Sequence, residues 1–305
     1  MLNKAFIITV DTEGDNLWEY HKGNTIQVKN AAYIPRFQKL CEEFNFKPVY
    51  LVNYEMAKCR PFIRNARVWL QKNACEVGIH LHAWNNPPQF DIEGPYTGNP
   101  YLIEYPDFIM REKFKVVYNL IVNNFGITPV SHRAGRWSMD DRYFQILKDF
   151  GIKVDCSYTP GISWAKSLGV TIGGSDYSSY KNQVYYVNDV MEVPTTICKF
   201  KHISKGTFIH SLKSLLIGEN VWLRPAICTL NSMKKVVDYC DQQKIGYLEF
   251  MIHSSELMPG GSIYFEKKDD IDKEYDTMRS FFEYVANKGY IGYTLQNFYN
   301  ATMCL

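Results

Sequence analysis

The sequence lacks blocks of like charge. Its 305 residues include 34 Lys and Arg and 32 Asp and Glu, and no run of five or six charges of one sign interrupts them. Proteins that bind nucleic acid or an anionic membrane surface through their charge usually concentrate basic residues in such runs. We therefore expect no nucleic-acid partner.

Long apolar stretches are also missing. No uninterrupted apolar run approaches the ~20 residues of a spanning helix, so we expect no integral membrane segment. A short apolar run at 5–10 leads at once into an acidic cluster, whereas a secretion signal needs an apolar core of ~7–15 residues and a small-residue cleavage site. We read no export signal here and expect a cytoplasmic protein.

Closely spaced cysteine pairs are absent as well. The eight cysteines form no CxxC pair, and several stand among apolar residues, at positions 41, 59, 75, 156, 198, 228, 240 and 304. None of these spacings resembles a cysteine zinc site. We expect reduced, buried thiols of a cytosolic protein.

What the sequence does contain is an alternation of short apolar runs with longer amphipathic stretches, which is typical of parallel strands joined by helices. Strands are predicted at 5–11, 48–53, 76–82, 129–135, 152–158, 190–196, 247–254 and 292–297. Helices are predicted at 31–44, 55–73, 111–125, 139–150, 231–243 and 269–288. We predict an α/β fold, a distorted (β/α)7-8 barrel formed by residues 1–305 as one domain, although two smaller domains would also fit this length.

Two segments do not fit the alternation. Residues 84–108 contain NNPP, GP and GNP clusters, and residues 159–189 are rich in Gly, Ser and Tyr. Loops of this length often cover a binding site, so we predict two insertions that shape substrate binding. Trp84 and Trp137 flank the expected site and could pack on a sugar ring or an acyl methyl group, although aromatics near a barrel mouth are more often part of the core.

Seven polar residues stand at or just beyond the end of a predicted strand: Asp11, Glu13, His80, His82, Arg133, Asp155 and His253. Because the catalytic groups of α/β barrels gather where the strands end, we expect these side chains to meet.

His80 and His82 stand two apart, so both imidazoles project to the same side of an extended chain. Two imidazoles and one carboxylate can hold a divalent metal and leave a position for water. Taken alone, such a pair is more often a pair of hydrogen-bonded structural histidines.

The first strand ends in TVDTEGD, which places three carboxylates within five residues. One of them could bind the metal while another takes a proton from water, and a solvated turn is the alternative. His253 ends a very apolar strand, where its imidazole could protonate a leaving amine. A core or capped histidine is the alternative there.

Arg133 lies on a predicted strand, and if it points inward it can fix the charge and direction of a carboxylate. His132 must then point the other way as a structural residue. Asp155 could orient His253 or Arg133, or be a buried aspartate with a hydrogen-bonding role alone.

Taken in order, five segments resemble successive motifs of the polysaccharide deacetylases, carbohydrate esterase family 4: TVDTE, EVGIHLHAW, HRAGRW, KVDCSYTP and MIHSSEL. The resemblance extends over roughly residues 5 to 298. It implies a distorted barrel, a divalent metal that is usually zinc, and hydrolysis of an N- or O-acetyl group on a glycan. By position, it implies Asp11 as the catalytic base, His80 as the first metal histidine, Arg133 as the brace of the base and His253 as the general acid.

Two positions depart from the family pattern. Thr12 follows the base where a second aspartate is usual, so we assign the metal to Glu13, with Asp15 in reserve. The family's two histidines are usually four apart, and the fourth residue after His80 is a tryptophan, so we assign His82. The segment GIHLHAW resembles a subgroup found with enzymes of surface polysaccharide and O-antigen biosynthesis.

Substrate binding is assigned to Trp84, Gly135, Arg136 and Trp137, with backbone N–H groups near Gly135 or Arg136 facing the oxyanion. The expected substrate is an acetylated amino sugar in a nucleotide-linked or lipid-linked precursor.

Two other functions stay open at this point. One is a metal-independent glycoside hydrolase that pairs Asp11 or Glu13 with Asp155. The other is a catalytically inactive glycan-binding protein that kept the barrel and lost the metal.

Overall fold

Strand β1 (Ala5–Thr12) organises the sheet, since three other strands pair with it in parallel. β10 (Tyr247–His253) runs beside it from Ala5 to Asp11, while β11 (Ile291–Tyr293) pairs with its first half and β2 (Val49–Val52) with its second. The nine-stranded sheet then continues from β2 through β3 (Glu76–Leu81), β4 (Ser131–Ala134), β5 (Val154–Asp155), β7 (Val190–Glu192) and β6 (Tyr185–Val187). The computed structural model describes residues 4–17, 24–201 and 218–304.

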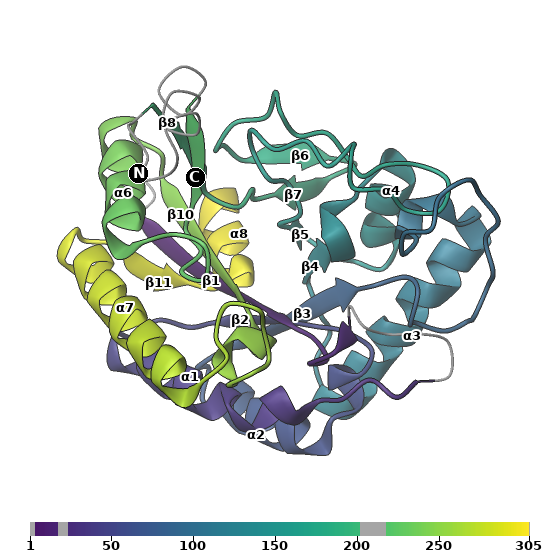
Figure 1. Ribbon diagram of the computed structural model, residues 1–305, viewed down its shortest axis with the longest axis horizontal. Helices are drawn as coiled ribbons and strands as arrows, with labels where there is room; N and C mark the ends of the chain where they lie inside the picture. The colour runs from purple at the N-terminus through teal and green to yellow at the C-terminus, as the bar shows by residue number, and fades with distance from the viewer. Residues whose placement is uncertain (1–3, 18–23, 202–217, 305) are drawn as a thin grey trace.

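Helices lie around the outside of this sheet (Figure 1). They are α1 (Ile34–Glu43), α2 (Arg60–Gln71), α3 (Asp107–Phe125), α4 (Asp141–Asp149), α6 (Leu230–Gln242) and α7 (Lys268–Asn287). The sheet curls into a half-barrel, which confirms the predicted distorted barrel, and each of the six predicted helices is present with shifted ends. A separate antiparallel pair is formed by β8 (Ile197–Phe200) and β9 (Glu219–Trp222).

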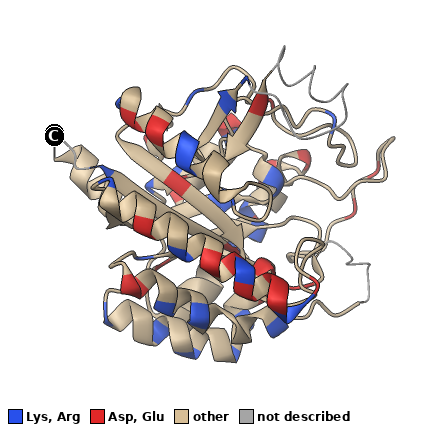
Figure 2. Cartoon of the chain, turned by 60° about the vertical axis from the view of Figure 1, so that its left-hand side comes forward, with Lys and Arg blue, Asp and Glu red and all other residues tan. Residues whose placement is uncertain are grey.

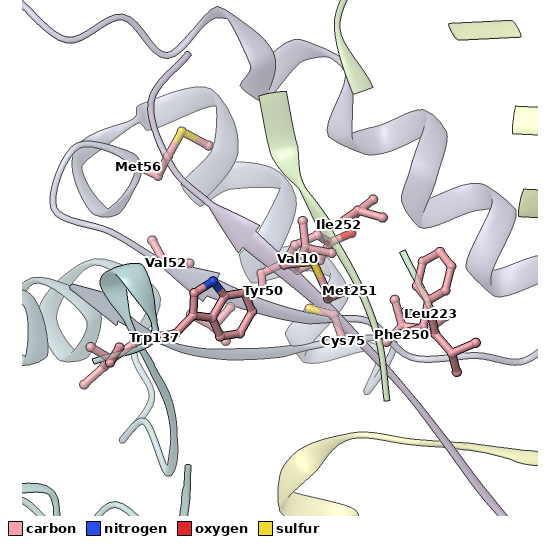
Figure 3. Packing of buried hydrophobic residues seen from close by; sticks show 14 of the residues in the cluster. Val10, Tyr50, Val52, Met56, Cys75, Trp137, Leu223, Phe250, Met251 and Ile252 are labelled. Carbon is pink, nitrogen blue, oxygen red and sulfur yellow. The ribbon is translucent and has the colours of Figure 1, made fainter. Parts of the chain in front are cut away.

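The alternation of side chains along β1 divides the core into two layers. Phe6, Ile8 and Val10 belong to an outer layer that the helices cover, part of which Figure 3 shows. Ala5 and Ile7 belong to a smaller inner layer. Toward the end of the strand the inward positions become polar, so the interior changes from an apolar base to a polar mouth.

The gap between β7 and β10 is spanned by irregular chain. The N–H of Thr196 donates to the carbonyl of Glu249 at 3.3 Å, and the N–H of Met251 donates to the carbonyl of Leu223 at 3.1 Å. In the described part of the chain, β7 and β10 form no strand ladder with each other. The barrel therefore has one side without a regular strand.

The prediction of a strand at 292–297 is wrong in its second half. The strand ends at Tyr293, and the Thr294 side chain accepts a hydrogen bond from the N–H of Asn297 to begin α8 (Leu295–Met303). Leu295 and Phe298 of this helix pack into the inner layer and fill the base of the barrel.

The eight cysteines form no disulfide in the structure, and six of them are buried. Within the described residues no helix has the length and apolar character needed to cross a membrane. Basic and acidic side chains are interspersed along the helices seen in Figure 2.

Candidate metal centre and active site

Six of the seven residues predicted to meet do so, at the C-terminal ends of four strands. Asp11 is the register partner of His253 across β1 and β10, and His80 is the partner of Arg133 across β3 and β4. Because both ladders are parallel, these side chains share one edge of the sheet. Glu13 follows β1 directly and is buried with them.

The candidate metal centre consists of Glu13, His80 and His82, whose ligand atoms lie within 4.8 Å of one another. Glu13 Oε2 is 2.7 Å from His82 Nε2 and 3.4 Å from His80 Nε2, and the two Nε2 atoms are 2.9 Å apart. Among the described residues, no other group of three His, Cys, Asp or Glu side chains is placed to share an ion. The period of an extended strand places both imidazoles on one side, as the sequence predicts.

The hydrogen bond of His80 fixes the orientation of its ring. Its Nδ1 lies 2.9 Å from the carbonyl oxygen of Arg133. Because a carbonyl can only accept, Nδ1 carries a hydrogen, and Nε2 is the ring nitrogen that faces the cluster and can ligate a metal. Burial alone would raise the pKa of Glu13, but His82 and His80 outweigh it and hold that pKa well below its ordinary value, so the carboxylate is ionised.

This donor set fits a divalent ion. Zinc with ligands at about 2.0–2.1 Å in a tetrahedral site holds its ligand atoms roughly 3.4 Å apart. The distance from Glu13 to His80 is already 3.4 Å, and the two contacts of His82 are 2.7 and 2.9 Å. These separations are close to those of ligand atoms around one ion, and three protein ligands leave a fourth position open.

Asp11 is held by a buried arginine. Arg133 Nη1 donates to Asp11 Oδ1 at 2.6 Å, while its Nη2 donates to Thr9 Oγ1 at 2.9 Å and to Glu249. Burial alone would raise the pKa of Asp11, but Arg133 and His80 outweigh it and lower that pKa. Asp11 is therefore an ionised carboxylate whose second oxygen, Oδ2, faces His80 and His253.

His253 lies on the other side of Asp11. Its Nε2 is 3.8 Å from Asp11 Oδ2, and its Nδ1 is 3.2 Å from Glu256 Oε1. Arg224 Nη2 donates to the same Glu256 oxygen at 2.5 Å. Burial alone would raise the pKa of Glu256, but Arg224 and His253 outweigh it and lower it to about 2. The charged Glu256 therefore orients the ring, with Nε2 directed toward the cavity.

The sequence matches no family model and no curated protein. Among solved structures, a protein from Mycobacterium smegmatis assigned as a polysaccharide deacetylase has a TM-score of 0.55 and 14% identity, over 99% of this chain and 91% of that chain. This chain has the polysaccharide deacetylase fold.

Two further solved structures belong to enzymes with different activities. A 4-alpha-glucanotransferase from Thermococcus litoralis has a TM-score of 0.58 and 13% identity, with 99% of this chain matching 40% of that chain. A family 4 carbohydrate esterase from Streptomyces lividans, solved with acetate, has a TM-score of 0.46 and 9% identity over 96% of this chain and 93% of that chain. At 14% identity, the likeness to the Mycobacterium smegmatis protein establishes the fold alone, and the activity has to be inferred from the site.

Asp155 is not brought to this site of the deacetylase fold. It lies on the outer face of the sheet, where its Oδ1 is 2.7 Å from His132 Nδ1 and accepts a hydrogen bond from Ser157 Oγ at 2.8 Å. His132 Nε2 contacts the hydroxyl of Tyr143 at 2.7 Å. His132 thus points away from Arg133, as predicted, whereas the expected contact of Asp155 with His253 or Arg133 is not present.

A cavity of about 760 Å³ opens over the metal centre. Asp11, Glu13, His80, His82 and His253 line its floor, and Arg136, Trp137, Trp164 and Tyr264 line its walls. Asp15 also borders the cavity, but its carboxylate accepts the N–H groups of Lys29 and Asn30 at 2.9 and 3.0 Å, which commits it to the loop.

The predicted substrate residues divide into two groups. Arg136 and Trp137 line the cavity, whereas Trp84 packs edge-on against His82 with ring centroids 4.6 Å apart. Gly135 lies so close to His82 that a Cβ atom there would be 2.7 Å from its Nδ1, so only glycine fits. Trp84 and Gly135 therefore border the metal ligand, not the open cavity.

Three residues of the site were not predicted from the sequence: Glu249, Glu256 and Arg224. Glu249 and His253 share the inward face of one strand at an even spacing, which is a usable signal for Glu249. Glu256 stands three residues after His253, in a turn-rich stretch that gives no such signal. Arg224 comes from irregular chain after β9 and could not be placed without the structure.

Proposed function

We propose that this protein is a metal-dependent hydrolase that removes an acetyl group from an acetylated amino sugar. The observation that supports this most directly is the buried cluster of Glu13, His80 and His82 beside the ionised Asp11. A structural ion pair does not require two imidazoles with their nitrogens turned toward one carboxylate, whereas a metal site does.

The residues divide the chemistry as follows. A divalent ion, which we propose is zinc, would act as a Lewis acid on the acyl oxygen and lower the pKa of a water molecule. Asp11 Oδ2 accepts a proton from that water, because Arg133 occupies its other oxygen and keeps it ionised. His253 Nε2, which lies 3.8 Å from Asp11 Oδ2, donates a proton to the departing amine.

Backbone N–H groups of the Gly135–Trp137 turn are our candidates for stabilising the oxyanion. This turn lies against the ring of His82, and Arg136 and Trp137 have left-handed φ values of 57° and 62°. Backbone strain of this kind persists where the surrounding structure enforces it, and functional sites are a common case. An ester substrate would use the same groups with an easier leaving step.

We further propose that the sugar belongs to a nucleotide-linked or lipid-linked precursor of a surface polysaccharide. This proposal rests on the resemblance of the GIHLHAW segment to deacetylases of that kind, and the expected location in the cytoplasm stays a prediction. The glycoside hydrolase alternative loses support, because Asp155 does not face Asp11 or Glu13.

Metal content and acetate release test the proposal together. The purified protein should hold one equivalent of a divalent metal, and His82→Ala should lose it with the activity. Asp11→Asn should keep the metal, since Asp11 is not a ligand, and lose activity by roughly 10²- to 10⁴-fold as expected for removal of a general base.

Other outcomes would point elsewhere. Release of reducing sugar that survives a chelator would support a glycoside hydrolase. A wild-type protein that binds glycans but cannot be loaded with metal would support the glycan-binding alternative.

A further inference from the structure

The charged side chains that line the cavity differ in the partners that they have within the protein. Four carboxylates of the lining have a partner in the protein: Asp11 has Arg133 at 2.6 Å, Glu256 has Arg224 at 2.5 Å, Glu13 has His82 at 2.7 Å, and the partly buried Asp15 has the N–H of Lys29 at 2.9 Å. The remaining carboxylate of the lining, Glu266, is exposed to solvent. The carboxylates of the lining other than Glu266 are therefore each engaged by a group of the protein.

Arg136, a cation of the cavity lining, has neutral partners. No carboxylate lies within 4.0 Å of its guanidinium among the described residues. Its partners are neutral oxygens: the carbonyls of Asn99 and Leu168 and the hydroxyl of Ser167. Glu104 acts on it only at longer range, because the carboxylate of Glu104 accepts backbone N–H groups of neighbouring loops. A half-buried guanidinium stays charged, so the cavity wall carries an unmatched cation.

This guanidinium is held in one place. It stacks on the ring of Tyr101 at 3.9 Å, and its hydrogen bonds reach Asn99 in one predicted insertion and Ser167 and Leu168 in the other. Its backbone belongs to the strained turn beside His82, with φ of 57°. A preorganised guanidinium loses little entropy when it binds an anion.

From this geometry we infer that Arg136 recognises an oxyanion, a carboxylate or a phosphate, carried by the acylated sugar near the reacting group. The inference rests on the proposed function for the identity of the sugar, but it assigns a substrate class that the metal centre alone does not. Guanidinium groups match the geometry of both oxyanions.

Binding measurements test this independently of turnover. The Asp11→Asn protein, loaded with zinc, would be titrated calorimetrically with N-acetylglucosamine, N-acetylglucosamine 1-phosphate and N-acetylmuramic acid. We expect one or both anionic sugars to bind about 10- to 100-fold more tightly than the neutral one, in line with charge-assisted hydrogen bonds. The anionic sugar that binds more tightly, the 1-phosphate or the muramic acid, identifies phosphate or carboxylate as the group that Arg136 recognises.

The variant Arg136→Gln in the same background should remove the preference, because the affinity for the anionic sugar falls much further than the affinity for the neutral sugar. Arg64→Gln changes an exposed arginine of α2 outside the cavity lining and should leave all three affinities as they are. Arg136→Lys keeps the charge and should retain part of the preference.

Several results would overturn the inference. Equal binding of the three sugars, or binding of none, would show that the cavity does not select an anion. Equal losses for neutral and anionic sugars in Arg136→Gln would show that Arg136 only joins the two loops. Failure of the proposed function would be seen separately, as absence of acetate release by the wild type despite a preserved preference in binding.

Discussion

At the scale of single residues, the state of His253 depends on the groups around it. Burial and Arg224 lower the pKa of its imidazole, but Glu256 and Glu13 outweigh them, so the pKa is raised above its ordinary value. A raised pKa keeps a general acid protonated to higher pH. Glu256, which contacts Nδ1, is thus the residue through which the acid can be tuned.

Glu256→Gln should shift the alkaline limb of the kcat/KM profile to lower pH. The substitution removes the negative charge that favours the imidazolium, so the pKa of His253 falls and the acid loses its proton earlier as pH rises. The titration of His253 followed by NMR checks the cause. Glu266→Gln, at an exposed carboxylate of the same cavity, is the control and should leave the limb in place. An alkaline limb at the same pH in Glu256→Gln and in the wild type would contradict this role of Glu256.

Much of the site could be predicted from the sequence, because its residues stand at the ends of predicted strands. Asp11, His80, Arg133 and His253 end parallel strands, and parallel register places strand ends together. Asp155 also ends a strand but faces outward, since it is one residue out of phase with the inward positions Val154 and Cys156. Strand position alone therefore does not settle which side chains enter the site.

At the scale of elements, a helix fixes the loop that follows His82. Lys113 of α3 is 1% exposed, and its Nζ donates to the carbonyls of Ala83, Asn86 and Pro88 at 3.0, 2.6 and 2.7 Å. Burial lowers the pKa of Lys113 to about 8, so at pH 7 it still carries three N–H donors for three acceptors. The position of the chain after His82 thus depends on one buried ammonium.

Lys113→Met should lower the free energy of unfolding by about 3 kcal/mol, because three carbonyls lose their donor and each unsatisfied group costs about 1–3 kcal/mol. It should also weaken zinc binding by roughly tenfold, as loss of outer-shell support does elsewhere. Denaturant unfolding and zinc titration measure the two effects. Lys115→Met, at an exposed position of the same helix, should change neither. Similar losses in both variants would show that the buried ammonium has no special role.

The elements themselves were predictable to different degrees. The long helices follow from periodicity, whereas the apolar run at 292–297 favours a strand although Thr294 caps a helix there. A short apolar run does not distinguish a strand from the first turn of a buried helix. Leu295 and Phe298 stand three residues apart, which is a helical spacing. Only their packing at the base of the barrel shows that this spacing marks a helix.

At the scale of the whole molecule, the site joins parts of the chain that are far apart. Arg133 reaches Asp11 across 122 positions, and Ser254 Oγ accepts the N–H of Glu13 across 241. The barrel that brings them together could be predicted from the alternation of strands and helices. Its irregular side at Thr196 and Leu223 could not, because those contacts follow no period.

Because the cluster is buried and assembled from distant strands, its ion should stabilise the folded chain as a whole. An ion that binds only the folded state, at 100 times its Kd, adds about 2.7 kcal/mol. For a domain of this size we expect zinc to raise Tm by roughly 5 °C. Asp11→Asn keeps the ligands and should show the same rise, whereas His82→Ala should show none in thermal unfolding with and without zinc. An equal rise in His82→Ala would place the ion elsewhere and remove the basis for the metal centre.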